Sequence, residues 1–180
     1  EFVSKCVGES KKLKVGNPLF EGSDLGPFAV KFQMEKVISH IQDALDKGAK
    51  LVYGGTRIMD KGYFFSPGVM IDVNHSMKIM GEETFGPITP VMKFSDVNDA
   101  VRLANDSQYG LTASIWTSDL KKGEKIARQI EAGTVEINRH GMSKAGCPWG
   151  GYKKSGIGRI YSKEGIREFT NIKHVWVVKS

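Results

Sequence analysis

The chain has 180 residues, of which 40% are hydrophobic and 26% charged, and its formal net charge is +6. This composition is ordinary for one globular domain with its own core, and no apolar run reaches membrane-spanning length. The lysines and arginines are spread without zinc-finger spacing or an arginine-rich block, so we interpret the basic charge as a solvated surface and expect no nucleic-acid partner.

The first half of the chain alternates apolar helical patterns with turn-forming segments. Gly16-Asn17-Pro18 is a helix stop and is followed by a loop rich in glycine, proline and aspartate. The clearest helical signal is a set of apolar residues at steps of three and four: Met34, Val37, Ile38, Ile41 and Leu45. The predicted elements are a helix over 1–14, a loop over 17–27, a helix through 34–45, a strand over 49–53 and extended chain over 63–73. Within the last of these, Pro67 indicates a sheet edge or a bulge.

The second half alternates predicted strands with predicted helices. They are a strand over 88–94, a helix from Asp96 or Asn98 to about 105, a strand over 112–117, a helix from Ser118 or Asp119 to about 132, and a strand over 134–138. This order predicts an α/β layer with parallel strands and right-handed crossovers. A glycine-rich loop then runs to residue 159. A short helix over 163–169 and a β-prone tail over 174–178 complete the prediction.

A short acidic segment between these halves, Glu82-Glu83-Thr84-Phe85-Gly86-Pro87, carries the first chemical signal. A carboxylate before an aromatic ring, on a turn set by Gly-Pro, suits a ribose, because a carboxylate accepts charge-assisted hydrogen bonds from vicinal hydroxyls. The aromatic ring adds stacking area. The alternative is a surface turn with an acidic pair and a buried phenylalanine, and these six residues alone favour that alternative.

Several further segments lie in a fixed order around this one: 62–67, 105–111, 132–138 and 148–159. Together with 81–87 they resemble motifs of the NAD(P)-dependent aldehyde dehydrogenase superfamily, in that family's order and approximate spacing. The resemblance covers nearly the whole chain and concerns the C-terminal part of the catalytic region. It implies a three-layer α/β fold with a mostly parallel sheet, plus a C-terminal oligomerisation strand. It implies an incomplete catalytic domain over 1–150, a crossing segment over 151–170 and the strand within 171–180.

The resemblance also implies roles for particular residues. Glu83 and Phe85 match the positions that bind and flank the nicotinamide ribose, which implies NAD or NADP as the cofactor. The loop over 139–149 matches the aldehyde tunnel, with Gly141, Ser143 and Trp149 at pocket-lining positions. Trp149 is either an apolar wall of that tunnel or a core residue, and both interpretations are open. Ile160 stands where many members of the family carry glutamate.

The residues that carry out the oxidation in this family have no counterpart in this chain. By resemblance, a cysteine thiolate attacks the aldehyde and a thioester forms, but the nucleophile and the general-base glutamate lie upstream of residue 1. Cys6 and Cys147 are the only thiols, and nothing near either in the sequence predicts an activated thiolate. They form no disulfide framework, and with the four histidines they give no metal motif, which indicates a reducing, cytoplasmic setting. The chain also opens without methionine and within a predicted helix, so it is interpreted as a fragment or a processed product that is inactive alone.

The expected partners follow from the same resemblance: a small-molecule aldehyde, the remaining N-terminal part of the enzyme, and further copies of the chain joined through the tail, with no membrane. Residues 153–159 lack the order of a phosphate-binding loop, so their cations are expected to tie the crossing segment to neighbouring chain. Two alternatives stay open. The Arg139-His140 pair faintly resembles the branch that oxidises glyceraldehyde 3-phosphate without phosphorylating it. The other alternative is a stand-alone, non-catalytic module of the same fold.

Overall fold

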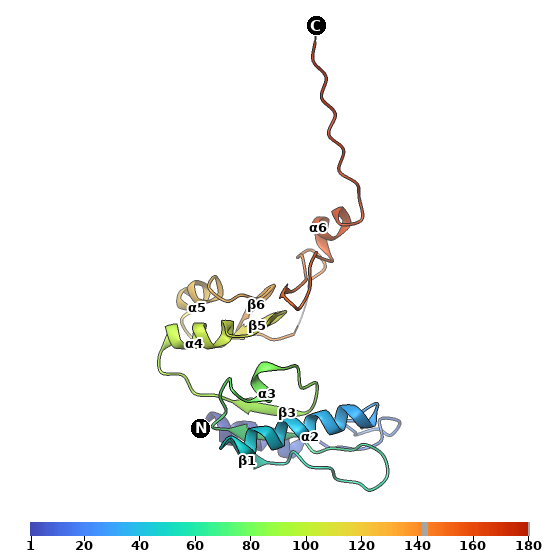
Figure 1. The fold of residues 1–180 in the computed structure, drawn as a ribbon, viewed down its shortest axis with the longest axis vertical. Coiled ribbons are helices and arrows are strands. Elements are labelled where there is room, and N and C mark those ends of the chain that lie inside the picture. The colour runs from blue at the N-terminus through green and yellow to red at the C-terminus, as the bar shows by residue number, and fades with distance from the viewer. Residues whose placement is uncertain (142–143, 180) are drawn as a thin grey trace. The chain divides into compact units, whose positions relative to one another are not determined.

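A computed structural model describes residues 1–141 and 144–179 (Figure 1). The chain divides into two compact units, one over residues 1–93 and the other from residue 94 onward. Each unit has its own helices and strands, and each is described by itself below. Among the described residues, no helix combines the length and the apolar character needed to cross a membrane.

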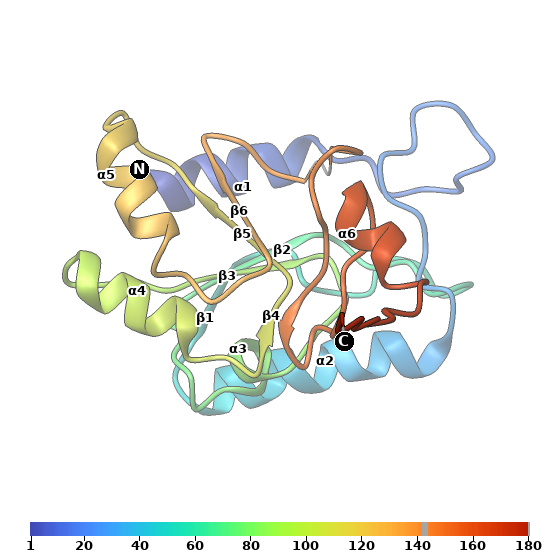
Figure 2. The same ribbon diagram turned by 90° about the horizontal axis from the view of Figure 1, so that it is seen from above.

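The first unit is a three-stranded sheet with a helix on each side. Its elements are α1 (Phe2–Lys12), α2 (Lys31–Asp46), β1 (Lys50–Tyr53), β2 (Gly68–Ile71), α3 (Lys78–Gly81) and β3 (Ile88–Val91). The central strand β2 pairs antiparallel with β1 and parallel with β3. Figure 2 shows α1 and α2 on opposite sides of this sheet. Of the two predictions made from Pro67, the sheet edge is wrong, because the proline lies just before the central strand β2, where it removes no hydrogen bond from the ladder. The β1–β2 pairing does contain a register shift, between Leu51 and Tyr53 of β1.

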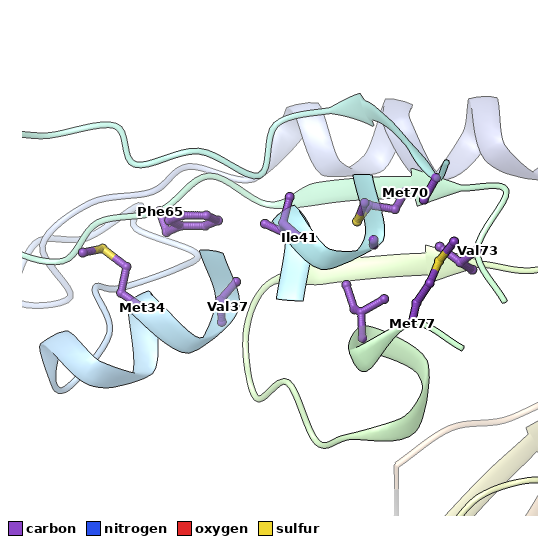
Figure 3. Close-up of a cluster of buried hydrophobic side chains, with 10 residues drawn as sticks. Met34, Val37, Ile41, Phe65, Met70, Val73 and Met77 are labelled. Atoms are coloured by element: carbon purple, nitrogen blue, oxygen red, sulfur yellow. The ribbon is translucent and has the colours of Figure 1, made fainter. Parts of the chain in front are cut away.

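The core of this unit lies between α2 and β2. Met34, Val37 and Ile41 of α2 face Phe65 and Met70, and all five side chains are at most 6% exposed (Figure 3). Burying each such side chain contributes about 1.5–3 kcal/mol to the free energy of unfolding. The apolar stripe of α2 is narrower than predicted, because Ile38 and Leu45 lie at its flanks and remain 43% and 37% exposed.

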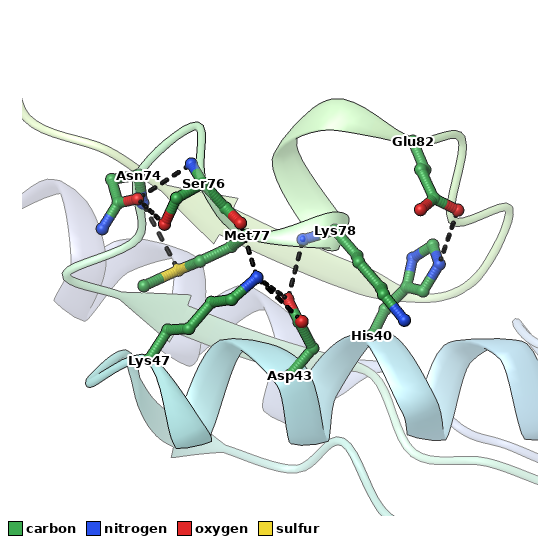
Figure 4. Close-up of polar contacts among 8 residues, drawn as sticks. All are labelled: His40, Asp43, Lys47, Asn74, Ser76, Met77, Lys78 and Glu82. Carbon is green, nitrogen blue, oxygen red and sulfur yellow. Dashed lines mark hydrogen bonds and ion pairs between the residues drawn. The ribbon is translucent and has the colours of Figure 1, made fainter.

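The short helix α3 was not predicted, and its position is set by a side chain of α2. The carboxylate of Asp43 accepts a hydrogen bond of 2.8 Å from the backbone N–H of Lys78, the first residue of α3 (Figure 4). Lys47 Nζ lies 2.8 Å from Asp43 Oδ1 and also donates to the carbonyl of Ser76 at 2.5 Å. The hydrogen bond from Lys47 lowers the pKa of Asp43. These contacts hold the first residue of α3 against α2. The segment that follows α3, residues 82–87, therefore also lies beside α2.

The second unit contains α4 (Val97–Asn105), β4 (Tyr109–Gly110), β5 (Thr112–Ile115), α5 (Leu120–Ala127), β6 (Thr134–Ile137), β7 (Tyr152–Lys153) and α6 (Ser162–Arg167). The predicted strand–helix–strand order is confirmed for 112–137, because β5 and β6 pair in parallel and α5 connects them. The strand predicted over 88–94 does not join this layer, since β3 pairs with β2 in the sheet of the first unit. Asp96 and Asp119 are the N-caps of α4 and α5, and each side chain accepts a backbone hydrogen bond of 3.0 Å. Of the two candidates given for each helix start, the structure therefore selects the aspartate.

A two-residue antiparallel pairing of β4 with β7 joins the glycine-rich loop to the rest of the second unit. Lys153 Nζ lies 2.7 Å from Glu131 Oε2 and donates to the carbonyl of Asn105 at 2.7 Å. Lys154 donates to Gln108 Oε1, also at 2.7 Å. The structural role predicted for these two cations is therefore confirmed, since both tie the segment around β7 to neighbouring chain of the same unit.

The predicted α/β class is confirmed, with parallel pairs β2–β3 and β5–β6 beside the antiparallel pairs β1–β2 and β4–β7. The tail differs from its prediction. Residues 171–179 form no strand within the chain, and the side chains of 175–178 are 72–81% exposed. A strand needs a hydrogen-bonding neighbour, and β-prone residues alone do not supply one.

Candidate functional site

The predicted cofactor residues lie on an exposed turn between α3 and β3, which we call the acidic turn (residues 82–87). The side chains of Glu83 and Phe85 are both exposed, the latter to 75%. Phe85 has a φ of 50°, in the left-handed region that an aromatic residue seldom adopts. Such backbone strain persists only where surrounding contacts hold it, and it often marks functional positions.

Helix α2 supplies those contacts through polar side chains that the sequence analysis did not identify. Gln33 Nε2 donates to the carbonyls of Thr84 and Phe85, both at 2.8 Å. Lys36 Nζ donates to the carbonyl of Glu83 at 2.5 Å. The backbone of the turn is thus held at three successive carbonyls, while the Glu83 side chain is left in solvent.

His40 is the most buried polar residue at the site, with 2% of its surface exposed. Its Nδ1 lies 3.0 Å from Thr84 Oγ1. Its Nε2 lies 3.3 Å from Glu82 Oε2, a contact that Figure 4 shows. Burial lowers the pKa of His40, although the neighbouring Glu82 carboxylate opposes that shift. Gln33, Lys36 and His40 are spaced by three and four, so a polar stripe runs along α2 beside its apolar stripe. That spacing was the signal in the sequence that could have identified them.

The close approach of the turn to α2 also requires a glycine. A Cβ added at Gly86 would lie 2.5 Å from Val37 Cγ2 and 3.4 Å from Phe28 Cζ. Beside the glycine is an apolar hollow of about 370 Å³. Its lining residues come from the loop before α2, from the approach to β2 and from the acidic turn: Leu25, Gly26, Pro27, Phe28, Phe65, Phe85, Gly86 and Pro87. The exposed ring of Phe85 therefore forms one wall of an apolar surface.

The residues of the acidic turn fit the ribose and ring of a nicotinamide cofactor. Among the described residues, the Glu83 carboxylate has no hydrogen-bond or ion-pair partner, so both oxygens are free to accept hydroxyl hydrogens. A carboxylate with free acceptor oxygens can bind the two ribose hydroxyls, and the exposed aromatic ring beside it can pack against the planar nicotinamide. Within the described part of the chain, no group of three or more histidine, cysteine or acidic side chains is placed to hold a metal ion.

The predicted substrate loop borders a second hollow, of about 270 Å³, in the other unit. It is lined by Thr134, Glu136, Ile137, Arg139, Lys144, Cys147, Pro148 and Trp149. Trp149 is half-buried, and its backbone pairs with Ile160 through hydrogen bonds of 2.9 and 2.8 Å. Its side chain lines the hollow and does not belong to the buried core cluster, and its role as a wall of an aldehyde tunnel stays a prediction.

The remaining residues of this loop have different partners. The backbone N–H of Gly141 donates to Glu136 Oε2 at 2.6 Å, and Arg139 Nε lies 3.7 Å from Glu136 Oε1. Ser143 lies outside the described residues. His140 points to another partner, because its Nδ1 lies 3.0 Å from Ser114 Oγ. Cys147 is an exposed free thiol and Cys6 a partly buried one.

Comparison with known proteins gives a consistent result across the chain. A sequence profile of the aldehyde dehydrogenase family matches residues 1–175. The chain is 40% identical over 177 residues to an aldehyde dehydrogenase of Enchytraeus buchholzi, an alignment that covers 98% of this chain and 36% of that relative. It is 41% identical over 177 residues to aldehyde dehydrogenase 1A1 of Macaca fascicularis, covering 98% of this chain and 35% of the relative. The chain thus spans about a third of the length of these relatives.

Solved structures agree with the sequence comparison. An aldehyde dehydrogenase from Bacillus cereus in complex with NAD+ has a TM-score of 0.92 at 38% identity, over 97% of this chain and 36% of the other. Betaine aldehyde dehydrogenase from Staphylococcus aureus, also in complex with NAD+, has a TM-score of 0.87 at 36% identity, over 93% of this chain and 34% of the other.

Proposed function

The chain belongs to the aldehyde dehydrogenase family, and from that premise we propose that it is part of an oxidoreductase that converts an aldehyde to a carboxylic acid with NAD(P)+. The observation that carries this proposal is the free carboxylate of Glu83, exposed on a turn whose backbone α2 holds at three carbonyls. A fixed backbone with a free side chain is what a binding residue needs, because orientation is set before the ligand arrives.

In this proposal, Glu83 holds the nicotinamide ribose and Phe85 packs beside it. When bound, the cofactor supplies a hydride acceptor, and the chain's own residues orient it. Orientation is a large part of catalysis, since well-placed reactants avoid an entropic barrier. The NAD+ complexes of the two similar structures support NAD as the cofactor, and NADP is the alternative that cofactor titration would test.

The hollow lined by Trp149 is the proposed aldehyde-binding surface. Gly141 and Ser143 are proposed to contribute to substrate binding because both fall within the sequence segment 139–149 that matches the aldehyde tunnel. An aromatic wall suits the apolar part of a small substrate. The remaining N-terminal part of the enzyme is proposed to supply the cysteine that forms the thioester and the glutamate that serves as its base. We assign Cys147 no nucleophilic role, since a nucleophile needs a base within hydrogen-bond reach and, among the described residues, this thiol has no hydrogen bond to one.

The 180-residue chain by itself is expected to oxidise no aldehyde and to bind NAD+ weakly or not at all. It offers a carboxylate and a ring for one part of the cofactor, while the proposed nucleophile is absent. The measurement is NADH absorbance during incubation of the purified chain with NAD+ and a panel of aldehydes, with a complete aldehyde dehydrogenase as the positive control. Clear NAD+ reduction by the chain would contradict the proposed division of the enzyme.

A second candidate function is oxidation of an aldehyde that carries an anionic group, such as a phosphorylated aldehyde. The observation that favours it is a pair of cations, Arg139 and Lys144, in the lining of the substrate hollow. Arginine binds phosphate oxygens through charge-assisted hydrogen bonds. Glu136 also lines this hollow and lies 3.7 Å from Arg139, so part of the positive charge is compensated.

Arg139→Gln in the complete enzyme is expected to raise KM for a phosphorylated aldehyde by about tenfold, because one charge-assisted hydrogen bond contributes roughly 1.5 kcal/mol or more. KM for a neutral aldehyde should stay nearly unchanged. Steady-state kinetics with both substrates measures the ratio. Arg128→Gln is the matched control, since Arg128 is an exposed arginine of the same unit that pairs with Glu124 outside the hollow. Equal effects of Arg139→Gln on both substrates would argue against an anion-selective pocket.

The proposed organisation has a catalytic region over 1–150, a crossing segment over 151–170 and an assembly segment over 171–180. The row of exposed apolar side chains over 175–178 supports assembly, since an unpaired extended segment of this kind recruits another strand. A homo-oligomer is the proposed product. Cytoplasmic location is proposed from the two thiols, which are both free.

A further inference from the structure

His40 has a position that the proposed function does not explain. It is a polar ring, 2% exposed, on a helix whose other buried residues are apolar: Met34, Val37, Ile41 and Ala44. A buried polar group costs free energy unless it is hydrogen-bonded, and a hydrophobic residue would fill the same space without that cost. Its two ring nitrogens instead contact two residues of the acidic turn that directly flank Glu83.

The chemistry of the two partners fixes how the ring is protonated when it is neutral. The Glu82 carboxylate can only accept, so the hydrogen is on Nε2, which lies 3.3 Å from Glu82 Oε2. Nδ1 is then an acceptor, and the Thr84 hydroxyl 3.0 Å away must donate to it. A second proton on the ring would turn Nδ1 into a donor. The Thr84 hydroxyl would then have to reverse its role from donor to acceptor.

We propose that His40 is a positioning residue for the cofactor: its neutral ring holds Thr84 and Glu82, and so presents Glu83 and Phe85 in the binding arrangement. Protonation of the ring disturbs that arrangement. This inference rests on the proposed function, because it takes the acidic turn as the cofactor-binding segment. The Glu82 and Thr84 contacts are separate from the bonds that Gln33 and Lys36 make to the backbone of the turn.

The charges around the ring determine the direction of the pH effect. Burial is the largest influence on His40 and lowers its pKa from the ordinary 6.5. Lys36 on α2 and Lys78 on α3 act in the same direction, while Glu82 on the turn opposes them. A lowered pKa in the folded state means that the contribution of the neutral ring is complete above about pH 6.5. That contribution is lost as the pH falls through the lowered pKa.

The first measurement follows the turn without cofactor. In the complete enzyme that contains this chain, the backbone amide signals of Thr84 and Phe85 are followed by nuclear magnetic resonance from about pH 8 to pH 5. They are expected to shift together with the imidazole signal of His40, with a midpoint below 6.5. In His40→Gln, whose amide can donate to Glu82 but does not titrate, that joint shift should disappear. Amide signals that show no titration at the imidazole midpoint would overturn the proposal.

The second measurement is the dissociation constant of NAD+ over the same pH range. Acidification is expected to weaken binding roughly fivefold, the size expected for loss of one neutral hydrogen bond. His40→Gln should abolish that pH dependence. A dissociation constant with the same pH dependence in His40→Gln and the unsubstituted enzyme would overturn the positioning role. Failure of the unsubstituted enzyme to bind NAD+ at any pH would instead refute the proposed function, so the two failures are distinguishable.

A pair of substitutions at Thr84 separates positioning from general stability. Thr84→Val keeps the shape and removes the hydroxyl, so NAD+ binding should already be roughly fivefold weaker at pH 8 and should respond less to acid. Thr84→Ser keeps the hydroxyl and should retain the normal pH response. Thr89→Val is the control for loss of a threonine hydroxyl in general. Thr89 is an exposed residue of β3 with no described contact to the His40 ring. Equal NAD+ binding by Thr84→Val and Thr84→Ser at every pH would contradict the proposal.

Discussion

Glu83→Gln in the complete enzyme is expected to slow hydride transfer by about ten- to a hundredfold. The substitution keeps the shape of the side chain but removes the charge that strengthens its hydrogen bonds to the ribose hydroxyls. Bonds to a charged group contribute roughly 1.5–3 kcal/mol, and each 1.4 kcal/mol corresponds to a factor of ten in rate. The backbone of the turn should stay in place, because Gln33 and Lys36 bind carbonyl groups that the substitution does not change.

The measurement is single-turnover formation of NADH, compared with the rate at which a thiol reagent modifies the proposed upstream cysteine. Hydride transfer should fall and thiol reactivity should stay nearly constant, since the carboxylate is assigned to the cofactor alone. Glu35→Gln is the matched control: Glu35 is a glutamate on α2 whose carboxylate pairs with Lys31 rather than with the turn. Unchanged single-turnover rates in Glu83→Gln would remove the role assigned to Glu83.

Gly133→Ala is expected to have the largest effect on the stability of the second unit. A Cβ at Gly133 would lie 1.7 Å from the carbonyl oxygen of Gly150 and 2.8 Å from its carbon, far inside van der Waals contact. Neither segment can yield easily, because Gly133 directly precedes β6 and Gly150 follows Trp149 in its bridge to Ile160. The expected loss is about 3 kcal/mol in the free energy of unfolding.

Thermal unfolding monitored by circular dichroism tests this expectation. For a unit of this size, a loss of about 3 kcal/mol lowers Tm by roughly 12 °C or more. Gly146→Ala is the control in the same unit, since a Cβ at Gly146 meets no atom within 4 Å. A Tm for Gly133→Ala within a degree or two of the control would mean that the two segments are not packed as closely as described.

The sequence predicted the longer elements well because their signals are local. The apolar steps through Met34, Val37 and Ile41 define α2, and the aspartates before α4 and α5 are ordinary caps. The helix α3 and the β4–β7 pair were missed for a shared reason. Each is four residues or fewer, and each depends on a distant partner, such as the Asp43 carboxylate at the start of α3. No local pattern contains that information.

The candidate site shows the same difference between local and distant signals. Glu83 and Phe85 were identified because they belong to a contiguous motif, and their exposure agrees with a binding role, which remains a proposal. The residues that hold the turn, Gln33, Lys36 and His40, lie more than 40 positions earlier in the chain. The sequence offered only a polar stripe on α2, which is also what a solvated helix face looks like. The tail over 174–178 was predicted as a strand from its β-prone residues and from the family resemblance, and among the described residues it has no neighbouring strand.

Helix α2 has one further consequence, for protein engineering. The same helix carries the apolar stripe that packs on β2 and the polar stripe that forms hydrogen bonds with the acidic turn. Val37 even belongs to both, since it packs in the core and limits the space at Gly86. A library that repacks Val37 for heat resistance would therefore shift the helix against the turn as well. Variants selected from such a library should be tested for nucleotide affinity before they are ranked by melting temperature. A change at Val37 is expected to affect both properties, because the residue contacts both the core and the turn.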